Sequence, residues 1–317
     1  MKITIVAFDL WGFNQRIVDH LQTNGHDVTF IDSNKIKYIY KNKWDRVKNF
    51  FSKNILKKNI KKEFLNKKLN ELIYNLPTQD YILIVNPDHF RLEIVNLLKT
   101  KTKRYIAYNY DSLERNPLPK NYKELFHKIY SFDIFDVQKN NHLNLLTNFI
   151  YTEKDFDTKP KNKAFMILSK SEDRERILSK IADIFDKKSI TNYEFIVANP
   201  ALKDVNKNIV LTEQHIKLDQ VLDKVKNAEI LIDLVRKNQS GLSFRFFEAM
   251  AFQKKIITNN ASVVHYDFYD SRNILILEDS FDTIDEEFLQ SPYVPIPEEI
   301  YNKYTMKSFV NTLFPEH

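Results

Sequence analysis

Two segments of the chain repeat one pattern, an apolar run followed by a polar turn and an amphipathic helix. The pattern occurs in residues 1–24 and again from residue 164, where "AFMIL" precedes "SKSEDRERILSKIADIFDK". Strands that alternate with helices indicate a parallel sheet, which binds ligands outside the carboxyl ends of its strands. A second apolar run after the first helix, "VTFID", completes a βαβ unit, and further apolar runs predict strands at 81–85, 105–108, 193–198, 229–234, 255–258 and 274–277.

The repeated pattern predicts an α/β protein with two Rossmann-like domains. The chain has 317 residues, and domains of about 150 residues are common. A polar stretch at 151–163, "YTEKDFDTKPKNK", separates the two patterns. We therefore expect an N-terminal acceptor-binding domain at 1–157, with a basic helical insertion at 35–76. The expected nucleotide-sugar-binding domain spans 158–317 and ends in one or two closing helices.

Composition excludes several classes of protein. The chain has no cysteine, which excludes disulfides and thiolate metal sites. No apolar run approaches 18 residues, the length that would indicate a membrane-spanning helix. The start, "MKITIVAFDLWGF", reads as a first strand and not as a signal peptide, because it carries an acid at Asp9 and no small-residue cleavage site. These features predict a cytoplasmic protein.

The chain contains only three glycines. Gly12 follows the first strand, and Gly25 is predicted to end the first helix. Gly241 lies between a strand ending at Asp233 and a helix that carries Glu248. Because glycine allows a ligand to approach the backbone or φ to be positive, we expect Gly12 to turn the chain into an acceptor site and Gly241 to approach a ligand.

The stretch "NQSGLSFRFFEAMAFQKKIITNN", residues 238–260, has the parts of a nucleotide diphosphate site. A helix N-terminus after a glycine turn favours phosphate oxygens. Ser240 and Ser243 add hydroxyl groups, Arg245 can pair with a phosphate through two hydrogen bonds, and Glu248 is suited to a ribose diol. The same residues also fit a plain turn, an N-cap at Ser243 and a surface pair of Arg245 with Glu248.

The segment "QSGLSFRFFEAMAFQKKIITNN" closely resembles one in bacterial capsular and lipopolysaccharide glycosyltransferases of the GT-B fold. The resemblance continues in "DRERILSKI", "YDFYDSRNILIL", "EEIYNKYTMKSFVNTLF", "YNYDSLERNPLP" and "KIYSFDIFDVQKN", and it covers roughly residues 105–316. It implies two Rossmann-like domains facing a cleft, metal-independent sugar transfer, and Asn259 at the donor site. Many retaining members carry two glutamates separated by seven residues. Glu248 fits the second of these, but Ser240 stands at the first.

Sugar transfer requires charge stabilisation on the leaving diphosphate and, in an inverting enzyme, a base for the acceptor hydroxyl. For the diphosphate we expect Arg245, then Arg174 and Lys170 in the turn "SKSEDR". The alternative for Arg174 is a solvated helix face.

The base is expected in the first domain, where acids follow predicted strands. The candidates are Asp9, Asp88 with His89, and Asp111. Asp111 is the first choice and Asp9 the second, with turn capping as the alternative role for each. Aromatic neighbours of Asp111 can wall an acceptor sugar and raise the pKa of its carboxyl by desolvation. The expected acceptor site comprises Gly12, Asp88, His89, Tyr108 and Tyr110.

The sequence predicts no metal and no cofactor, since the nucleotide sugar is a substrate. The motif "DFD" at 155–157 has the D-x-D form with which the other glycosyltransferase fold holds a divalent ion. It lies in the expected linker, and no histidines are spaced as ligands on one helix.

Residues 35–69 carry thirteen Lys or Arg against two acids, interleaved with aromatic residues. Such a segment is attracted to an anionic membrane surface, although nucleic acid binding and a solvated face are alternatives. No nucleic-acid-binding motif accompanies it. We predict peripheral association with the inner face of the membrane and no nucleic acid partner.

The predicted function is transfer of a sugar from a nucleotide diphosphate donor to a surface glycan or lipid-linked acceptor in capsule or lipopolysaccharide synthesis. The alternatives are a nucleotide-sugar epimerase of similar fold and a non-catalytic nucleotide-binding scaffold of an envelope assembly complex. A Rossmann dehydrogenase is disfavoured because no G-x-G-x-x-G occurs.

Overall fold

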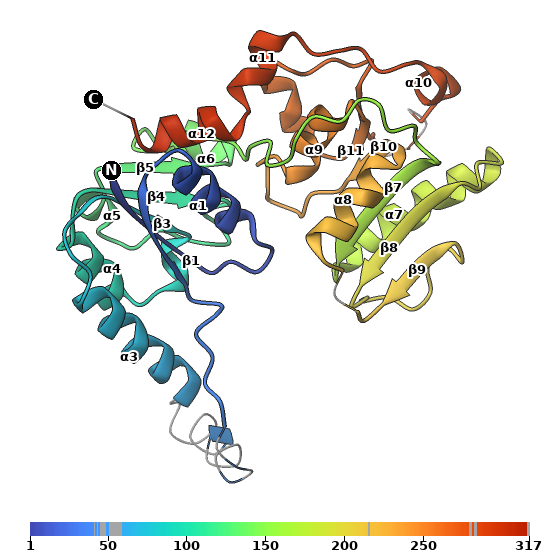
Figure 1. Cartoon of the computed structure of the whole chain (residues 1–317). Coiled ribbons are helices and arrows are strands. Elements are labelled where there is room, and N and C mark those ends of the chain that lie inside the picture. The colour runs from blue at the N-terminus through green and yellow to red at the C-terminus, as the bar shows by residue number, and fades with distance from the viewer. Residues whose placement is uncertain are drawn as a thin grey trace. The chain divides into compact units, whose positions relative to one another are not determined.

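The computed structural model describes residues 1–40, 42, 44, 49–50, 59–214, 216–278, 281 and 284–315. The chain divides into two compact units, which Figure 1 shows as two sheets with their helices. Unit 1 comprises Met1–Ser131 and Asp136–Leu145, and unit 2 comprises Phe132–Phe135 and Leu146–Pro315.

Unit 1 is built on a six-stranded parallel sheet in the order β2-β1-β3-β4-β5-β6. The expected strands are confirmed, and two short ones, β5 and β6, are added. The strands are β1 Lys2–Ala7, β2 Asp27–Asp32, β3 Gln79–Val85, β4 Thr102–Asn109, β5 Lys128–Ser131 and β6 Asn144–Leu145. The helices are α1 Phe13–Thr23, α3 Ile60–Tyr74, η1 Pro87–His89, α4 Leu92–Lys99, α5 Tyr122–Leu125 and α6 Ile134–Lys139, which crosses the division between the units.

Both faces of the unit 1 sheet are covered. Ile82 and Ile84 of β3 pack in one cluster with apolar residues of α3 and α4. The intervening Leu83 is also fully buried, as expected for a parallel sheet between two helix layers. The first helix ends as predicted, because Gly25 adopts a left-handed φ of 81° just after it.

Unit 2 has a second six-stranded parallel sheet, in the order β12-β11-β10-β7-β8-β9. Its strands are β7 Asn162–Ser169, β8 Tyr193–Ala198, β9 Ile209–Thr212, β10 Ala228–Asp233, β11 Lys255–Thr258 and β12 Ile274–Ile276. Its helices are α7 Glu172–Lys187, α8 Leu218–Lys226, α9 Phe244–Phe252, η2 Ala261–His265, α10 Glu286–Gln290, α11 Glu298–Lys303 and α12 Met306–Leu313. The closing helices predicted from the sequence are α11 and α12.

The division between the units lies near residue 146, whereas the sequence places it at 157. The Asn148 side chain donates to the Leu242 carbonyl at 2.9 Å, and the Ile150 amide donates to the Tyr304 carbonyl at 2.8 Å. These contacts tie the segment to unit 2. The polar residues from 151 onward marked a connection along unit 2 and not the domain boundary.

In each sheet the chain adds strands first on one side of its first strand and then on the other, so that the strand order reverses there. In unit 1 the chain passes from β1 to β2 on one side and then adds β3 on the other; in unit 2, β7 is followed by β8 on one side and β10 on the other. Counted within the unit, unit 2 has the 3-2-1-4-5-6 order of dinucleotide-binding sheets. Open α/β sheets bind ligands outside the carboxyl ends of the strands at such switch points. Ligand sites are therefore expected beyond the carboxyl ends of the pairs β1/β3 and β7/β10.

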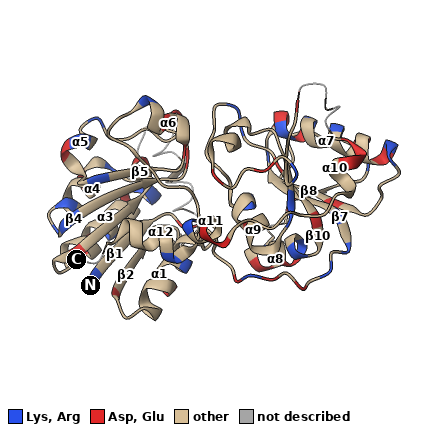
Figure 2. Ribbon diagram, turned by 90° about the horizontal axis from the view of Figure 1, so that it is seen from above, with Lys and Arg blue, Asp and Glu red and all other residues tan. Residues whose placement is uncertain are grey.

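The basic insertion expected at 35–76 is helical in α3. Residues 41, 43, 45–48 and 51–58 of the insertion lie outside the described residues. Lys and Arg are interspersed with Asp and Glu on both units (Figure 2). Within the part of the chain that the structure describes, no helix combines the length and the apolar character needed to cross a membrane.

Candidate functional site

Arg174 links the two strands that form the unit 2 switch point. It lies in the first turn of α7 and donates through Nη2 to the Ser169 carbonyl at 3.0 Å and through Nη1 to the Leu234 carbonyl at 3.4 Å. Ser169 ends β7, and Leu234 directly follows β10. The guanidinium therefore lies beyond the carboxyl ends of these neighbouring strands.

Three more basic side chains belong to the same edge. Lys170 directly follows β7 and is exposed. The Arg236 Nη2 atom lies 3.5 Å from the Ser169 hydroxyl oxygen, and the exposed Lys237 follows Arg236. The structure thus gathers Lys170 and Arg174, which the sequence predicted, with Arg236 and Lys237, which it did not. The missed signal was a pair of basic residues soon after a buried strand.

Glu175 fixes the loop beside this basic cluster. Its fully buried carboxylate accepts hydrogen bonds from the Ser171 amide at 2.9 Å, the Ala201 amide at 3.0 Å and the Leu202 amide at 2.7 Å. Burial by itself raises the pKa of Glu175, but these backbone donors lower it further than burial raises it, so that the pKa falls below its usual value. The carboxylate joins the start of α7 to the loop after β8.

The turn before α9 binds a carboxylate of the protein itself, that of Asp133. The buried Asp133 carboxylate accepts the amide hydrogens of Ser240 at 2.8 Å and Gly241 at 3.0 Å, and it also accepts the Ser240 hydroxyl. These are donors that the sequence assigned to a diphosphate. The Phe135 amide, at 3.1 Å, is a further donor to Asp133.

Gly241 has a packing role in the structure. A Cβ atom at this position would overlap the ring of Phe132, which is itself buried. The residue has to be glycine for this reason, whether or not a ligand approaches the turn.

Ser243 is the N-cap of α9, as one alternative predicted. Its hydroxyl oxygen accepts the Arg245 amide at 3.1 Å, while its hydroxyl donates to Asp233 at 2.6 Å. The Thr258 hydroxyl donates to the other carboxylate oxygen of Asp233 at 3.0 Å. Burial raises the pKa of Asp233, although the two hydroxyl groups and the charge of Arg245 oppose the shift.

Arg245 and Glu248 form an ion pair across one turn of α9. The pair is not on the surface, because Glu248 is only 2% exposed. Its second oxygen accepts the Tyr151 hydroxyl, and the Arg245 guanidinium lies 5.6 Å above the ring of Phe165. Both residues predicted for donor contacts thus have partners inside unit 2. Asn259 also has one, since its Oδ1 accepts the Val235 amide at 2.8 Å.

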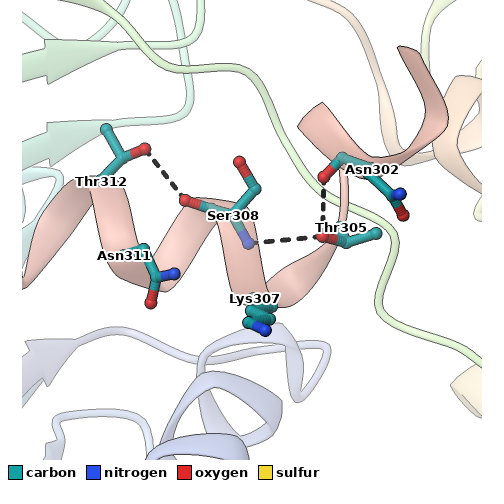
Figure 3. Close-up of a pocket in the computed structure, with 6 residues that line it drawn as sticks. All are labelled: Asn302, Thr305, Lys307, Ser308, Asn311 and Thr312. Carbon is teal, nitrogen blue, oxygen red and sulfur yellow. Dashed lines mark hydrogen bonds between the residues drawn. The ribbon is translucent and has the colours of Figure 1, made fainter. Parts of the chain in front are cut away.

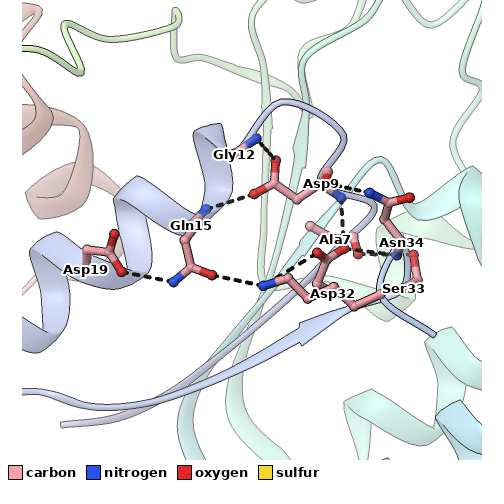
Figure 4. Close-up of polar contacts among 9 residues, drawn as sticks. Ala7, Asp9, Gly12, Gln15, Asp19, Asp32, Ser33 and Asn34 are labelled. Atoms are coloured by element: carbon pink, nitrogen blue, oxygen red, sulfur yellow. Dashed lines mark hydrogen bonds and ion pairs between the residues drawn. The ribbon is translucent and has the colours of Figure 1, made fainter. Parts of the chain in front are cut away.

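In unit 1, Asp9 caps the first helix. Its carboxylate oxygens accept the amide hydrogens of Gly12 and Gln15, both at 2.9 Å (Figure 4). Gly12 has a left-handed φ of 84°, as a sharp turn before a helix requires. The capping role that the sequence left open for Asp9 is therefore present, and its two oxygens are engaged by backbone.

Asp88, His89 and Asp111 follow neighbouring strands at the same edge of the sheet. Partial burial of the Asp88 carboxyl raises its pKa, and the negative charge of Asp111 adds to the shift while His89 opposes it. Asp111 itself pairs with Arg115 at 2.9 Å and accepts the Ser112 amide at 3.2 Å. The structure brings these predicted acceptor-site residues together.

The two predicted tyrosines also lie at this edge. Tyr108 is buried, and its ring centre is 6.2 Å from that of Tyr110. Burial raises the pKa of Tyr110 to about 12; the charges of Asp9 and Asp111 add to the shift, and a hydrogen bond with Asn14 opposes it. The Tyr110 hydroxyl therefore stays protonated at neutral pH.

A polar cavity of about 550 Å³ lies on α11 and α12 (Figure 3). Its lining consists of Asn302, Thr305, Lys307, Ser308, Asn311 and Thr312. The threonine hydroxyls donate to backbone carbonyls of the same helices. The cavity contains none of the residues predicted for donor or acceptor.

The described residues contain no group of three His, Asp or Glu side chains placed to hold a metal ion. Asp155 of the "DFD" motif accepts hydrogen bonds from Thr158 and pairs with Lys226 at 3.3 Å. These partners lower the pKa of Asp155.

No protein-family model and no curated protein matches this chain. Solved structures resemble it in fold. An alpha-glucosyltransferase in complex with UDP-glucose and DNA containing an abasic site gives a TM-score of 0.55 at 14% identity, over 98% of this chain and 92% of its own. An alpha,alpha-trehalose-phosphate synthase (UDP-forming) from Burkholderia xenovorans gives 0.56 at 10% identity, over 98% of each chain. The UDP-GlcNAc 2-epimerase from Methanocaldococcus jannaschii gives 0.53 at 13% identity, over 99% of each chain. Two six-stranded parallel sheets flanked by helices, matched over nearly the whole chain, give this protein the GT-B fold.

Proposed function

We propose that this chain transfers a sugar from a nucleoside diphosphate sugar to an acceptor hydroxyl. The observation that carries the proposal is the cluster of Lys170, Arg174, Arg236 and Lys237 beyond the carboxyl ends of β7 and β10. Basic side chains at a switch point neutralise a diphosphate. The bond from the anomeric carbon to the diphosphate breaks, and the acceptor oxygen forms the new one.

Known proteins of this fold support the choice of donor. One solved neighbour is described in complex with UDP-glucose and another as UDP-forming. The donor contacts are assigned first to the basic cluster, since Arg245 is paired with Glu248 and the Ser240 amide with Asp133. Ser243 and Asn259 remain in the proposal as residues that hold the edge of the donor site.

Replacing Arg236 with Ala is expected to weaken nucleotide binding by a factor of about 10 to 150, since a hydrogen bond to a charged group contributes about 1.5–3 kcal/mol. Thermal unfolding with UDP-, GDP-, CMP-, dTDP- and ADP-linked compounds measures it, because a ligand of the native state raises Tm. We expect one nucleotide to raise Tm, and the rise to be smaller in the variant.

Arg272→Ala is the matched control. Arg272 lies before β12, at the amino edge of the same sheet, and its pair with Asp270 is exposed. This variant should bind the nucleotide as the wild type does. If none of the compounds raises Tm, the non-catalytic scaffold becomes the better hypothesis.

Asp88 is the proposed base, ahead of Asp111 and Asp9. Both oxygens of Asp9 accept backbone amides, and Asp111 is paired with Arg115. Asp88 is exposed, and its pKa is raised above the ordinary value of an Asp, which makes its carboxylate a stronger base. Asp88→Asn is expected to lower kcat/KM for transfer about 100-fold.

The pH dependence of the transfer rate tests Asp88 as the base. Only the ionised carboxylate accepts the proton, so the transfer rate should fall as pH drops through the raised pKa of Asp88, above the value of about 3.9 for an ordinary Asp. The residual activity of Asp88→Asn should lack that limb. Asp27→Asn, at the exposed start of β2, is the control. Full activity in Asp88→Asn would remove Asp88 from the mechanism.

Epimerisation is the second candidate, because the UDP-GlcNAc 2-epimerase matches both chains over almost their full length. Incubation with UDP-GlcNAc and no acceptor distinguishes the two. An epimer in the product supports epimerisation, whereas release of nucleotide only after an acceptor is added supports transfer.

We further propose a surface glycan or lipid-linked acceptor, as in capsule or lipopolysaccharide synthesis, and association with an anionic membrane. The thirteen basic residues of 35–69 support this location. The alpha-glucosyltransferase neighbour is in complex with DNA, so an acceptor assay should include duplex DNA beside saccharides. Sugar transfer to DNA would overturn the expectation of no nucleic acid partner.

A further inference from the structure

The loop between β1 and α1 exposes its apolar side chains and buries its charged one. Three large apolar side chains are exposed, namely Phe8 at 39%, Leu10 at 51% and Trp11 at 45%, whereas Asp9 among them is only 8% exposed. In a loop shaped only by solvent, the carboxylate would face water and the apolar groups would be covered. Three large exposed apolar groups within four residues, around a buried acid, single this loop out as a candidate binding surface.

Hydrogen bonds hold this loop in place. The Asp9 amide donates to the Asp32 carboxylate at 3.1 Å, and the Asn34 side chain donates to the Asp9 carbonyl at 3.0 Å (Figure 4). The Asp9 carboxylate in turn accepts the Gly12 and Gln15 amides. The inward carboxylate thus fixes a backbone that presents the apolar groups outward, and a fixed loop loses little conformational entropy on binding.

The loop lies at the unit 1 switch point. It follows β1, and η1 with Asp88 and His89 follows the neighbouring β3. The Phe8 and His89 rings meet edge to face at 6.1 Å. The Phe8 ring therefore lies against the residue next to the proposed base, and Trp11 follows in the same loop, at the edge where such sheets bind their ligands.

We propose that Phe8 and Trp11 form a stacking platform for a pyranose ring of a saccharide acceptor. This inference rests on the proposed sugar transfer. One face of a pyranose carries mostly C–H groups, which pack on the negative face of an aromatic ring. Its hydroxyls lie around the ring edge, where a carboxylate such as that of Asp88 can accept a proton from one of them. Aromatic rings beside a few polar groups are the usual lining of a small-molecule site.

Trp11 allows a direct test, because the chain has only two tryptophans, Trp11 and Trp44. In Trp44→Phe the emission reports on Trp11 alone. The probes are methyl glycosides of glucose, galactose, mannose, rhamnose and N-acetylglucosamine, and vesicles of phosphatidylcholine with or without phosphatidylglycerol. We expect a saturable change in emission with at least one glycoside, and about tenfold weaker binding when Phe8→Ala is added. Leu72→Ala, at an exposed apolar position on α3, should leave binding unchanged.

The outcomes separate this inference from the donor proposal. Phe8→Ala should raise the KM for the acceptor and leave the nucleotide-induced rise in Tm unchanged, since Phe8 lies in unit 1 and the proposed donor contacts lie in unit 2. Glycoside binding without any nucleotide effect would refute the donor site and keep the platform. No change in Trp11 emission with any glycoside would overturn the platform. A change with vesicles alone would also overturn it and would assign the loop to a lipid surface.

Discussion

Replacing Arg245 with Ala is expected to lower the free energy of unfolding by about 3–5 kcal/mol, because it leaves a buried carboxylate without its cation. Glu248 is 2% exposed and pairs with Arg245 through one oxygen. The charge of Arg245 also acts on the buried Asp233. Urea denaturation of the wild type and the variant, with equal slopes, measures the loss.

Two variants control this experiment. Arg176→Ala breaks an exposed pair with Glu172 on α7, so its cost should stay below about 1 kcal/mol. Adding Glu248→Gln to Arg245→Ala should recover part of the stability, because the buried charge is removed while the oxygen that accepts the Tyr151 hydroxyl is kept. A loss below 1 kcal/mol in Arg245→Ala would show that Glu248 is neutralised in another way.

The stability cost of Arg245→Ala also affects the reading of activity data. A variant that loses activity at Arg245 could have lost its fold, its donor contact or both. Arg236 lies at the exposed edge and is the better position for testing the donor site.

Asp133→Ala should cost about 4 kcal/mol of unfolding free energy. The substitution leaves the amide hydrogens of Ser240 and Gly241 without an acceptor in a buried turn, and each unsatisfied buried group costs about 1–3 kcal/mol. The Ser240 hydroxyl loses its acceptor as well. Differential scanning calorimetry and urea denaturation should both show the loss.

Asp157→Ala is the comparison, since Asp157 is exposed in the segment before β7 and its replacement should change stability by less than about 0.5 kcal/mol. Asp133→Asn should fall between the two, because one oxygen acceptor remains. If Asp133→Ala is as stable as Asp157→Ala, water replaces the carboxylate and the turn is open to other anions. Equal stability of the two variants would make Ser240 and Gly241 candidate donor contacts again.

Local sequence was enough for most of the elements. Apolar runs predicted nine of the strands, and the prediction of a helix beginning near Ser243 is confirmed by its N-cap. Periodicity and capping depend on residues a few positions apart, so they can be read along the chain. Strands β5, β6 and β9 were not predicted, because two to four residues are too few to show a period.

The candidate sites depend on strand order, which the sequence did not reveal. The gathering of Arg174 with Arg236 follows from the pairing of β7 with β10, strands separated along the chain by β8 and β9. The same holds for the Phe8 loop and His89, which meet because β3 pairs with β1. The sequence identified candidate residues by their chemical type, but it did not show which residues lie next to them in space.

Sequence alone determined that this chain forms two α/β units with parallel sheets, because hydrophobic period and turn chemistry are local properties. Tertiary structure alone decided which predicted ligand-binding groups already have partners. The Ser240 and Gly241 amides bind Asp133, and Glu248 binds Tyr151, from segments about a hundred positions earlier in the chain. A buried carboxylate has to be satisfied by whichever donors packing brings to it, and packing is fixed by the fold as a whole.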